Sequence, residues 1–266
     1  MSIQQKLFWM LIPAAGTGSR FKSAESVSAE VPKQYQKLTP QKSLLQYTVE
    51  QVIQHPRIAG LILALHPEDQ YFAGLGFATK KSIYHVTGGS SRTLSVLYAL
   101  DFACQNKLVR AEDWVLIHDI ARPLVSQQEI SQLIDAIHNH DAVYQGISLG
   151  LPMHDSVKRI ADTEQTTTIK TATQTTVQNT VQTIVRSEPR EQLWRSITPQ
   201  AARAGTLLSA LKEHRHDATI TDEMSALALV QAPCALIPGN SRNMKITTVE
   251  DLALVKLYSH DEQTRL

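Results

Sequence analysis

The sequence has little cysteine, almost no net charge and no long apolar run. Its two cysteines, Cys104 and Cys234, lie far apart and without the spacing of metal ligands, so we expect buried thiols. A net charge of +1 gives no general attraction to nucleic acid or acidic membranes, and any anion must therefore be bound locally. No apolar segment approaches the roughly 18 residues that span a bilayer.

The rest of the composition is that of an ordinary globular protein, with 42% hydrophobic and 19% charged residues. A chain of 266 residues can bury a sizeable core as one large domain, or as one domain with an excursion. The first residues, MSIQQKLFWMLIP, lack the basic start and the small-residue cleavage site of a signal peptide. We therefore expect a cytoplasmic protein.

Short apolar runs alternate with helical patterns along much of the chain. The pattern predicts strands at 7–12, 61–65, 83–86 and 114–118, and helices at 44–54, 93–104, 130–137 and 249–258. This alternation favours an α/β fold with a mostly parallel sheet. Ligands of such sheets bind beyond the carboxyl ends of the strands, so the loops after Ile12, Val86 and His118 should converge.

The alternation stops after Leu149. Between Thr166 and Thr183, nine of eighteen residues are threonine, which gives high β-propensity without a clear apolar face. We expect an exposed ribbon or a mobile loop here rather than core. An isolated two-stranded ribbon is only marginally stable in water. We therefore expect this arm to pack against another surface, such as another copy of the chain.

The first loop has the sequence LIPAAGTGSR, from Leu11 to Arg20. Gly16 and Gly18 permit a sharp turn or a close backbone approach, and Arg20 adds a permanent positive charge. A strand, a glycine turn and a cation together are typical of an anion site, although a lone Gly-x-Gly is often only a turn. The Gly-Lys-Ser/Thr end of a Walker loop is missing, and Phe21 fills the place of the third glycine of a dinucleotide fingerprint.

Two further loops follow predicted strands. The stretch VTGGSSRTLSV carries Gly88 and Gly89, which suit either contact with a flat base or sugar, or a helix start capped by Ser90 or Ser91. In LIHDIARPL, Asp119 ends a strand, where a carboxylate can hold Mg²⁺ against phosphate oxygens. The alternative is a surface pair with Arg122, which contributes little.

Two lysines complete a possible site. Lys33 follows a proline in VPKQYQ, and Lys245 begins a strand-like run in SRNMKIT with Asn243 two before it; a solvated face is the alternative for both. The stretch TITDEMSAL predicts a capped helix start with Asp222 and Glu223 at the positive end of the dipole, and we assign it a structural role. Together, the cations, one metal-type carboxylate and two glycine turns suit transfer at a triphosphate, where catalysis is largely positioning and charge stabilisation.

Eight motifs occur in an order that resembles one enzyme family. They are PAAGTGSR, PKQY, GGSSRTLSV, HDIARP, a Pro-x-x-Asp-Ser-x-Lys stretch at 152–158, LWRSITPQ, TDEMSAL and NMKITTVEDL. Over about residues 7–258 the chain resembles the 2-C-methylerythritol 4-phosphate cytidylyltransferases of the non-mevalonate isoprenoid pathway. The resemblance implies that CTP and methylerythritol phosphate give CDP-methylerythritol and pyrophosphate, with Mg²⁺. No covalent enzyme intermediate is needed.

The resemblance also implies an architecture. It predicts a Rossmann-like three-layer α/β fold with a mostly parallel central sheet and a protruding β-arm for dimerisation. We expect one nucleotidyltransferase domain over 1–266, with the arm excursion at about 150–190, and a homodimer whose arms interlock.

The resemblance implies three groups of site residues. The predicted catalytic cations are Arg20, Lys33 and Lys245. The predicted CTP-binding residues are Ala14, Ala15, Gly16, Gly18, Gly88, Gly89, Ser95 and Asp119, of which Asp119 also meets the metal. The residues predicted to bind the polyol phosphate are Arg122, Ser156, Arg190 and Thr198.

Two alternatives stay open at this point. A ribitol 5-phosphate cytidylyltransferase shares most of the CTP loop residues, so the acceptor is less firmly indicated than the donor. A non-catalytic relative that kept the nucleotide fold would be expected to lose charges, whereas Arg20, Lys33, Asp119 and Lys245 are all present.

Overall fold

The computed structural model describes residues 6–16, 18, 21, 31–170 and 176–263, and over 162–170, 176–181 and 260–263 it describes backbone alone. The chain divides into two compact units. The first comprises Met1–Leu149 and Ser196–Leu266, and the second Gly150–Arg195. Each is described by itself below.

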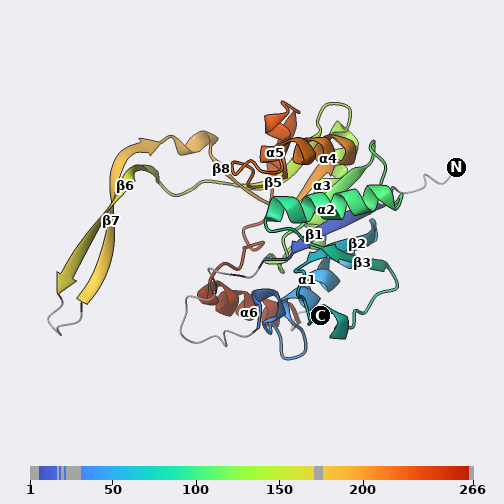
Figure 1. Cartoon of the computed structure of the whole chain (residues 1–266), viewed down its shortest axis with the longest axis horizontal. Coiled ribbons are helices and arrows are strands. Elements are labelled where there is room, and N and C mark those ends of the chain that lie inside the picture. Colours follow the sequence, from blue (N-terminus) through green and yellow to red (C-terminus); the bar gives the residue numbers. More distant parts are fainter. Residues whose placement is uncertain (1–5, 17, 19–20, 22–30, 171–175, 264–266) are drawn as a thin grey trace. The chain divides into compact units, whose positions relative to one another are not determined.

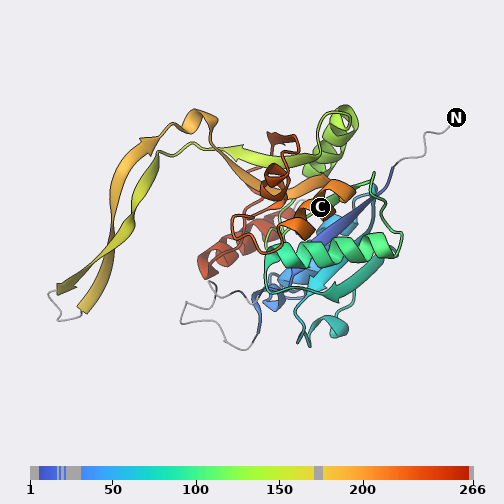
Figure 2. The same ribbon diagram turned by 45° about the horizontal axis from the view of Figure 1, so that its top comes forward.

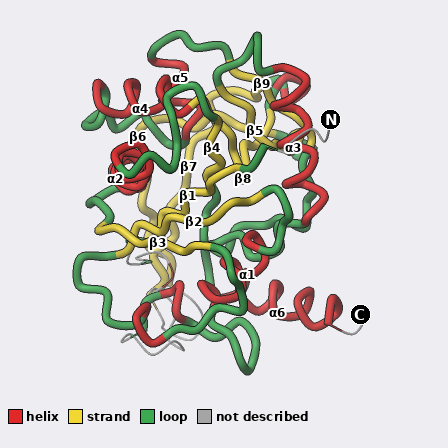
Figure 3. The backbone as a smooth tube through the Cα atoms, turned by 90° about the vertical axis from the view of Figure 1, so that its right-hand side faces the viewer, coloured by secondary structure: helices red, strands yellow, loops and turns green. Residues whose placement is uncertain are grey.

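A seven-stranded sheet with the order β3-β2-β1-β4-β8-β5-β9 forms the centre of the first unit. The strands β1, β2, β3 and β4 run parallel to one another, whereas β8 pairs antiparallel with β4. The predicted α/β fold with a mostly parallel sheet is confirmed (Figure 3). The strand bounds are β1 Phe8–Ala14, β2 Ile58–Leu65, β3 Ser82–Thr87, β4 Trp114–Ile117, β5 Gly146–Pro152, β8 Trp194–Arg203 and β9 Cys234–Pro238.

Helices cover both faces of this sheet, which makes three layers. Their bounds are α1 Leu44–Ile53, α2 Arg92–Gln105, α3 Gln127–His140, α4 Ala204–Glu213, α5 Glu223–Leu229 and α6 Val249–Gln263. One core cluster joins the sheet to α1 and α3, and a second joins it to α2, α4 and α5. Figure 1 and Figure 2 show α2 lying along the parallel strands.

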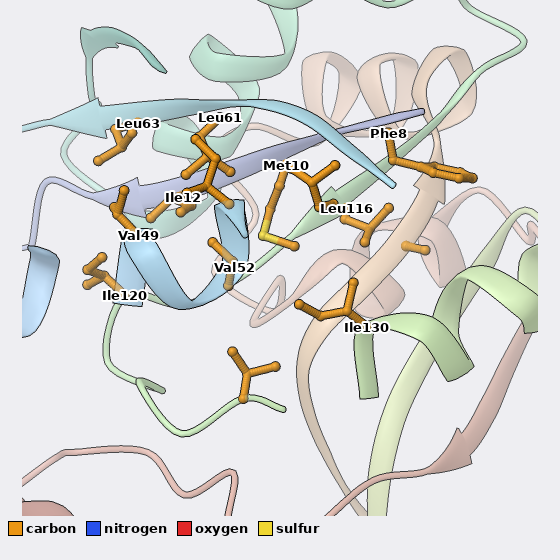
Figure 4. Packing of buried hydrophobic residues seen from close by; sticks show 14 of the residues in the cluster. Phe8, Met10, Ile12, Val49, Val52, Leu61, Leu63, Leu116, Ile120 and Ile130 are labelled. Atoms are coloured by element: carbon orange, nitrogen blue, oxygen red, sulfur yellow. The ribbon is translucent and has the colours of Figure 1, made fainter. Parts of the chain in front are cut away.

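Strand β1 shows why both faces can be covered. Successive side chains of a strand point to opposite faces, and β1 is apolar throughout. Phe8, Met10 and Ile12 pack toward α1 and α3 (Figure 4), whereas Leu11 packs toward α2. All four are completely buried. A strand buried on both faces lies at the centre of the sheet, so its carboxyl end opens between two layers.

Side-chain caps fix where the helices begin. The Ser91 hydroxyl accepts from the Leu94 amide and starts α2, while Asp222 forms a capping box with Ser225 at α5. Both helix starts were among the sequence predictions and are confirmed.

Two sequence predictions in this unit are wrong. Residues 244–247, which carry Lys245, form an irregular loop instead of a strand. Polar partners explain the first error, because the loop's backbone is held by Ala121 and by side chains rather than by a strand ladder. Cys104 and Cys234 are half-buried thiols, not fully buried ones.

The second unit contains an antiparallel two-stranded ribbon. It consists of β6, Val157–Lys170, and β7, Thr176–Glu188, paired from Val157 opposite Glu188 to Lys170 opposite Thr176 (Figure 1). The ribbon expected from the threonine-rich stretch is therefore confirmed. Its role in dimerisation stays a prediction. Among the described helices of the chain, none is long and apolar enough to cross a membrane.

Candidate active site

The loops that follow β1, β3 and β4 surround one cleft of about 720 Å³ in the first unit. This volume is in the range of small-molecule sites. Ten of the predicted site residues line it: Ala14, Ala15, Gly16, Gly18, Lys33, Gly88, Gly89, Ser95, Asp119 and Lys245. Because three parallel strands end here, residues from distant parts of the sequence meet at one edge of the sheet.

The glycine turns shape the floor of the cleft. Gly18 has φ +68°, a left-handed conformation that favours glycine. At Gly88 a Cβ atom would lie 2.5 Å from the Ala15 Cβ, so only glycine lets the second loop pack on the first. The Ser95 hydroxyl accepts from the Gly89 amide at 3.2 Å and donates to the Ser91 carbonyl at 2.9 Å. The second glycine loop is thus tied to the first turn of α2.

Lys33 and Lys245 come together although they are far apart in sequence. The Lys33 Nζ donates to the Ile246 carbonyl at 2.9 Å, next to Lys245. The Ile246 amide donates to the Ala121 carbonyl at 2.8 Å, which anchors this loop beside the one that carries Asp119. Two primary amines therefore border the cleft, and their positive charge favours binding of an anion.

Asp119 is 7% exposed and accepts from two cations. The Arg92 Nε lies 2.9 Å from its Oδ1, and the Lys245 Nζ lies 2.6 Å from its Oδ2. Burial would raise the pKa of the Asp119 carboxyl, but the charges of Arg92 and Lys245 outweigh burial and hold the pKa well below its ordinary value. The carboxylate is consequently charged at any physiological pH.

Arg92 is a site residue that the sequence analysis missed. Its Nη1 and Nη2 donate to the two carboxylate oxygens of Glu223 at 2.8 and 3.1 Å, while its Nε holds Asp119. The Glu223 side chain is 2% exposed and that of Arg92 is 26% exposed, so the carboxylate of this bidentate pair is buried while the guanidinium reaches the cleft. A signal was present: Arg92 is the first residue of α2, and a cation at the positive end of a helix needs anionic partners.

Comparison with known proteins identifies the family. A family model described as 2-C-methyl-D-erythritol 4-phosphate cytidylyltransferase matches residues 8–260. The chain belongs to this family. The match covers the whole seven-stranded sheet, the ribbon and the cleft, and it confirms the resemblance seen in the sequence motifs.

Individual members of the 2-C-methyl-D-erythritol 4-phosphate cytidylyltransferase family are similar to this chain along nearly their whole length. The Vibrio atlanticus protein of that name is 36% identical over 259 residues, which are 97% of each chain. The Vibrio cholerae protein of that name is 37% identical over 249 residues, 93% of this chain and 94% of the other. The crystal structure of the Francisella tularensis cytidylyltransferase superposes with a TM-score of 0.71 at 27% identity, covering 95% of this chain and 99% of that one.

Of the remaining predicted residues of this cytidylyltransferase, Arg122 and Thr198 do not line the described cleft. Arg122 and Thr198 lie in the first unit behind it; the Arg122 Nη1 donates to the Asn243 carbonyl at 2.7 Å, and Thr198 is 4% exposed. Ser156 and Arg190 are exposed residues of the second unit. They flank the Val157–Glu188 end of the ribbon, and the Arg190 guanidinium donates to the His154 carbonyl. Arg20 lies outside the described residues.

The sequence resemblance predicts Mg²⁺, and the described residues permit a particular kind of metal site. No group of three His, Cys, Asp or Glu side chains capable of holding an ion occurs in the described part of the chain. Mg²⁺, however, often takes only one or two carboxylates and completes its shell with water and substrate phosphates. Asp119, the carboxylate at the cleft, fits that arrangement. Its Oδ2 also accepts from Lys245, so a metal bound at this oxygen would share it with the lysine.

Proposed function

We propose that the protein transfers the cytidylyl group of CTP to 2-C-methyl-D-erythritol 4-phosphate and releases pyrophosphate, as the family's name states. The observation that carries this proposal is the convergence of Lys33, Lys245 and Asp119 on a cleft floored by two glycine turns. A non-catalytic relative would have no need to keep these three charges together. The product feeds the non-mevalonate route to isoprenoid precursors.

The reaction needs little covalent chemistry from the protein. An oxygen of the acceptor monophosphate forms a bond to the α-phosphorus of CTP, and the bond from that phosphorus to the bridging oxygen of the leaving pyrophosphate breaks. Negative charge develops on the α-phosphoryl oxygens and on the leaving group. We assign its stabilisation to Lys33 and Lys245, since positioning and charge supply most of the catalysis of such transfers. Arg20 is assigned to the same role by resemblance.

The glycine turns suit the nucleotide. A Cβ at Gly16 would meet no atom of the described residues within 4 Å, so their packing does not require glycine there, whereas close approach of a phosphate chain would. We assign Ala14, Ala15, Gly16 and Gly18 to the triphosphate side of the cleft. Gly88, Gly89 and Ser95 are assigned to the base, because a backbone free of side chains leaves room for a flat ring.

Two further assignments rest on the family. Mg²⁺ is proposed to enter with CTP, to take Asp119 as its protein ligand and to neutralise triphosphate charge when bound. The active protein is proposed to be a homodimer in which Ser156 and Arg190 bind the polyol phosphate. Exposed apolar side chains of the ribbon unit, Ile160, Ile184 and Val185, support a partner for the ribbon, because they are 48%, 60% and 60% exposed.

One assay tests the proposal. Purified protein is supplied with CTP, Mg²⁺ and either methylerythritol 4-phosphate or ribitol 5-phosphate, and pyrophosphate release is followed. We expect release with methylerythritol 4-phosphate and at most slow release with ribitol 5-phosphate. Preference for ribitol 5-phosphate would change the proposed acceptor and leave the proposed reaction, cytidylyl transfer from CTP, in place. Release with neither acceptor, from folded protein that binds CTP, would overturn the assignment as an enzyme.

A further inference from the structure

Lys33, Gln34 and Tyr35 form a single 3₁₀ turn, of which Lys33 and Gln34 line the cleft. A 3₁₀ helix has three residues per turn, so three consecutive side chains point about 120° apart. One short turn can therefore reach neighbours in three directions. The proposed function uses the Lys33 side chain and gives no role to the other two.

The first two side chains of the turn bind two different segments of the cleft. The Lys33 Nζ donates to the Ile246 carbonyl in the loop that carries Lys245. The Gln34 Nε2 donates to the Ala14 carbonyl at 3.1 Å, at the end of β1, and Gln34 is 3% exposed. The turn is thus joined to the loop of the second lysine and to the start of the first glycine loop.

The third side chain binds the loop that follows β2. The Tyr35 hydroxyl donates to the Asp69 Oδ2 at 2.5 Å, and the Tyr71 ring stacks on the Tyr35 ring with 4.9 Å between their centroids. The Asp69 Oδ1 accepts from the amides of Tyr71 and Phe72 at 3.0 and 2.9 Å. The Asp69 amide donates to the carbonyl of His66, which lines the cleft. Asp69 therefore orders its own loop and holds the lysine turn at the same time.

The bond between Tyr35 and Asp69 is suited to holding the turn while the Lys33 side chain moves. A hydrogen bond to a carboxylate is about twice as strong as one between neutral groups. Tyr35 is 7% exposed, so water competes little for its hydroxyl. Lys33 must direct its ammonium group toward a substrate phosphate, and the same group cannot also fix the main chain that carries it.

We propose that Tyr35 and Asp69 are a positioning pair: their hydrogen bond holds the main chain of the 3₁₀ turn so that the Lys33 ammonium group is presented to the cleft. Neither residue of the pair lines the described cleft, so both act through Lys33. This inference rests on the proposed function for the role of Lys33. It adds the loop after β2 to the residues on which that reaction depends.

Steady-state kinetics test the pair. Tyr35→Phe removes the hydroxyl and keeps the stacked ring, and we expect kcat to fall about 10- to 100-fold, since small displacements of catalytic groups have effects of this size. The KM for CTP should change less than about threefold. A raised KM with kcat unchanged would show that Tyr35 serves nucleotide binding alone and overturn the proposal.

A double substitution asks whether the two residues act as one unit. Asp69→Asn keeps the size of the side chain and removes the carboxylate that accepts from the Tyr35 hydroxyl. In the Tyr35→Phe, Asp69→Asn protein, kcat should be no lower than in the more impaired single variant, because both substitutions break the same bond. Single effects that multiply would show independent roles and contradict a positioning pair.

A tyrosine of the edge strand β3 provides the matched control. Tyr84 is 39% exposed, and its ring packs against that of Trp9 away from the lining of the described cleft. Tyr84→Phe should leave kcat unchanged. If Tyr35→Phe lowers thermal stability and also leaves kcat unchanged, the bond to Asp69 is only structural and the proposal is wrong.

Hydrogen exchange followed by mass spectrometry tests the pair without turnover. The Tyr35 amide donates to the Pro32 carbonyl and the Gln36 amide to the Lys33 carbonyl, so opening of the turn exposes both amides. In Tyr35→Phe we expect exchange of this peptide to be about tenfold faster, as loss of a hydrogen bond to a charged group predicts, and in Tyr84→Phe unchanged. Exchange at the wild-type rate in Tyr35→Phe would overturn the proposal. Because the measurement needs no substrate, it separates failure of the inference from failure of the proposed function.

Discussion

Lys245 and Asp119, which are 126 positions apart in the sequence, meet with 2.6 Å between the Nζ and Oδ2 atoms. The lysine side chain is 41% exposed, whereas that of the aspartate is 10% exposed. The ammonium group can therefore turn toward an incoming phosphate, while the carboxylate stays in place, held by Arg92 at its other oxygen. The pair keeps a flexible lysine at the cleft before the substrate arrives.

Removing either lysine should slow the chemical step. For Lys245→Ala and for Lys33→Ala we expect kcat to fall on the order of 10²–10³-fold, by analogy with the loss of one oxyanion donor. CTP binding, measured by calorimetry, should weaken much less. Lys37→Ala is the control, because Lys37 is exposed and close in sequence. A Lys33→Ala enzyme with a raised KM and an intact kcat would show that this lysine only binds.

The ion pairs of Arg92 predict a stability effect. Arg92→Met leaves two buried carboxylates, Asp119 and Glu223, without their shared cation, and loss of one partner of a buried pair costs about 3–5 kcal/mol. Urea unfolding of the two proteins measures this difference. Arg110→Met is the control, because the Arg110–Glu112 pair has side chains that are 79% and 69% exposed. We expect little change there, and equal effects of the two substitutions would contradict a stabilising role for Arg92.

Much of the fold could be predicted from the sequence, because apolar runs and helix caps are local signals. Residues that line the cleft were predicted where a motif lies directly after a strand, as at Gly16, Gly88 and Asp119. The pairing of Arg92 with Glu223 was missed, since it joins residues 131 positions apart and no local pattern names the partner. The strand expected around Lys245 was wrong for a related reason: the apolar pattern there reflects burial of Ile246, which is completely buried in a loop.

Two glycines of the cleft should respond differently to alanine. A methyl group at Gly16 meets no atom within 4 Å in the part of the chain that the structure describes, so Gly16→Ala should leave the unfolding temperature unchanged and raise the KM for CTP. At Gly88 the added Cβ lies 2.5 Å from Ala15, and such overpacking costs about 1–3 kcal/mol. Thermal unfolding and CTP kinetics of both variants test this contrast. An unchanged KM in Gly16→Ala would remove Gly16 from the nucleotide site.

His55 predicts a pH dependence of stability outside the cleft. It is 2% exposed, its Nδ1 accepts from the Arg57 amide, and its Nε2 contacts the Ser131 hydroxyl at 2.9 Å. Burial, together with the charges of Arg57 and Lys81, lowers the pKa of His55 below its ordinary value. As pH falls below about 6.5, the ordinary histidine pKa, the unfolded chain takes up a proton that the folded chain does not, and the free energy of unfolding decreases.

A substitution isolates the contribution of His55. His55→Asn keeps an acceptor near the Nδ1 position and removes the titrating ring, so the free energy of unfolding should vary less between pH 7 and pH 5 than in the wild type. Urea unfolding at several pH values measures the slope. His140→Gln is the control, since His140 is exposed and its loss should leave the slope unchanged.

The nucleotide base offers a test of the glycine loop. Gly88 and Gly89 are proposed to lie against the base. Because they pack closely on Ala15 and Leu94, the loop has little freedom to move and enlarge the space for the base. Cytosine should therefore be favoured over the larger purines, and ATP and GTP should be poor donors. Equal pyrophosphate release from CTP and ATP would contradict the assignment of this loop to the base.

The last prediction concerns the proposed homodimer. Arg190 belongs to the ribbon unit, and Lys33 lines the cleft of the first unit. We predict that Arg190 contacts the acceptor phosphate in the partner's cleft, whereas Lys33 acts in its own. Lys33→Ala and Arg190→Ala homodimers should then each be nearly inactive. In a mixed dimer, the protomer with an intact Lys33 receives the intact Arg190 of its partner, so one of two sites is complete.

Remixing the two variants after mild denaturation measures this complementation. Random pairing makes about half of the dimers mixed, and one working site in each restores about a quarter of the wild-type sites. Lys33→Ala mixed with Lys245→Ala is the control; both lysines act in one cleft, so mixing should restore nothing. Tagged subunits confirm that mixed dimers form. Pyrophosphate release that stays at the level of the separate homodimers, in confirmed mixed dimers of Lys33→Ala and Arg190→Ala, would place Arg190 in its own subunit's site.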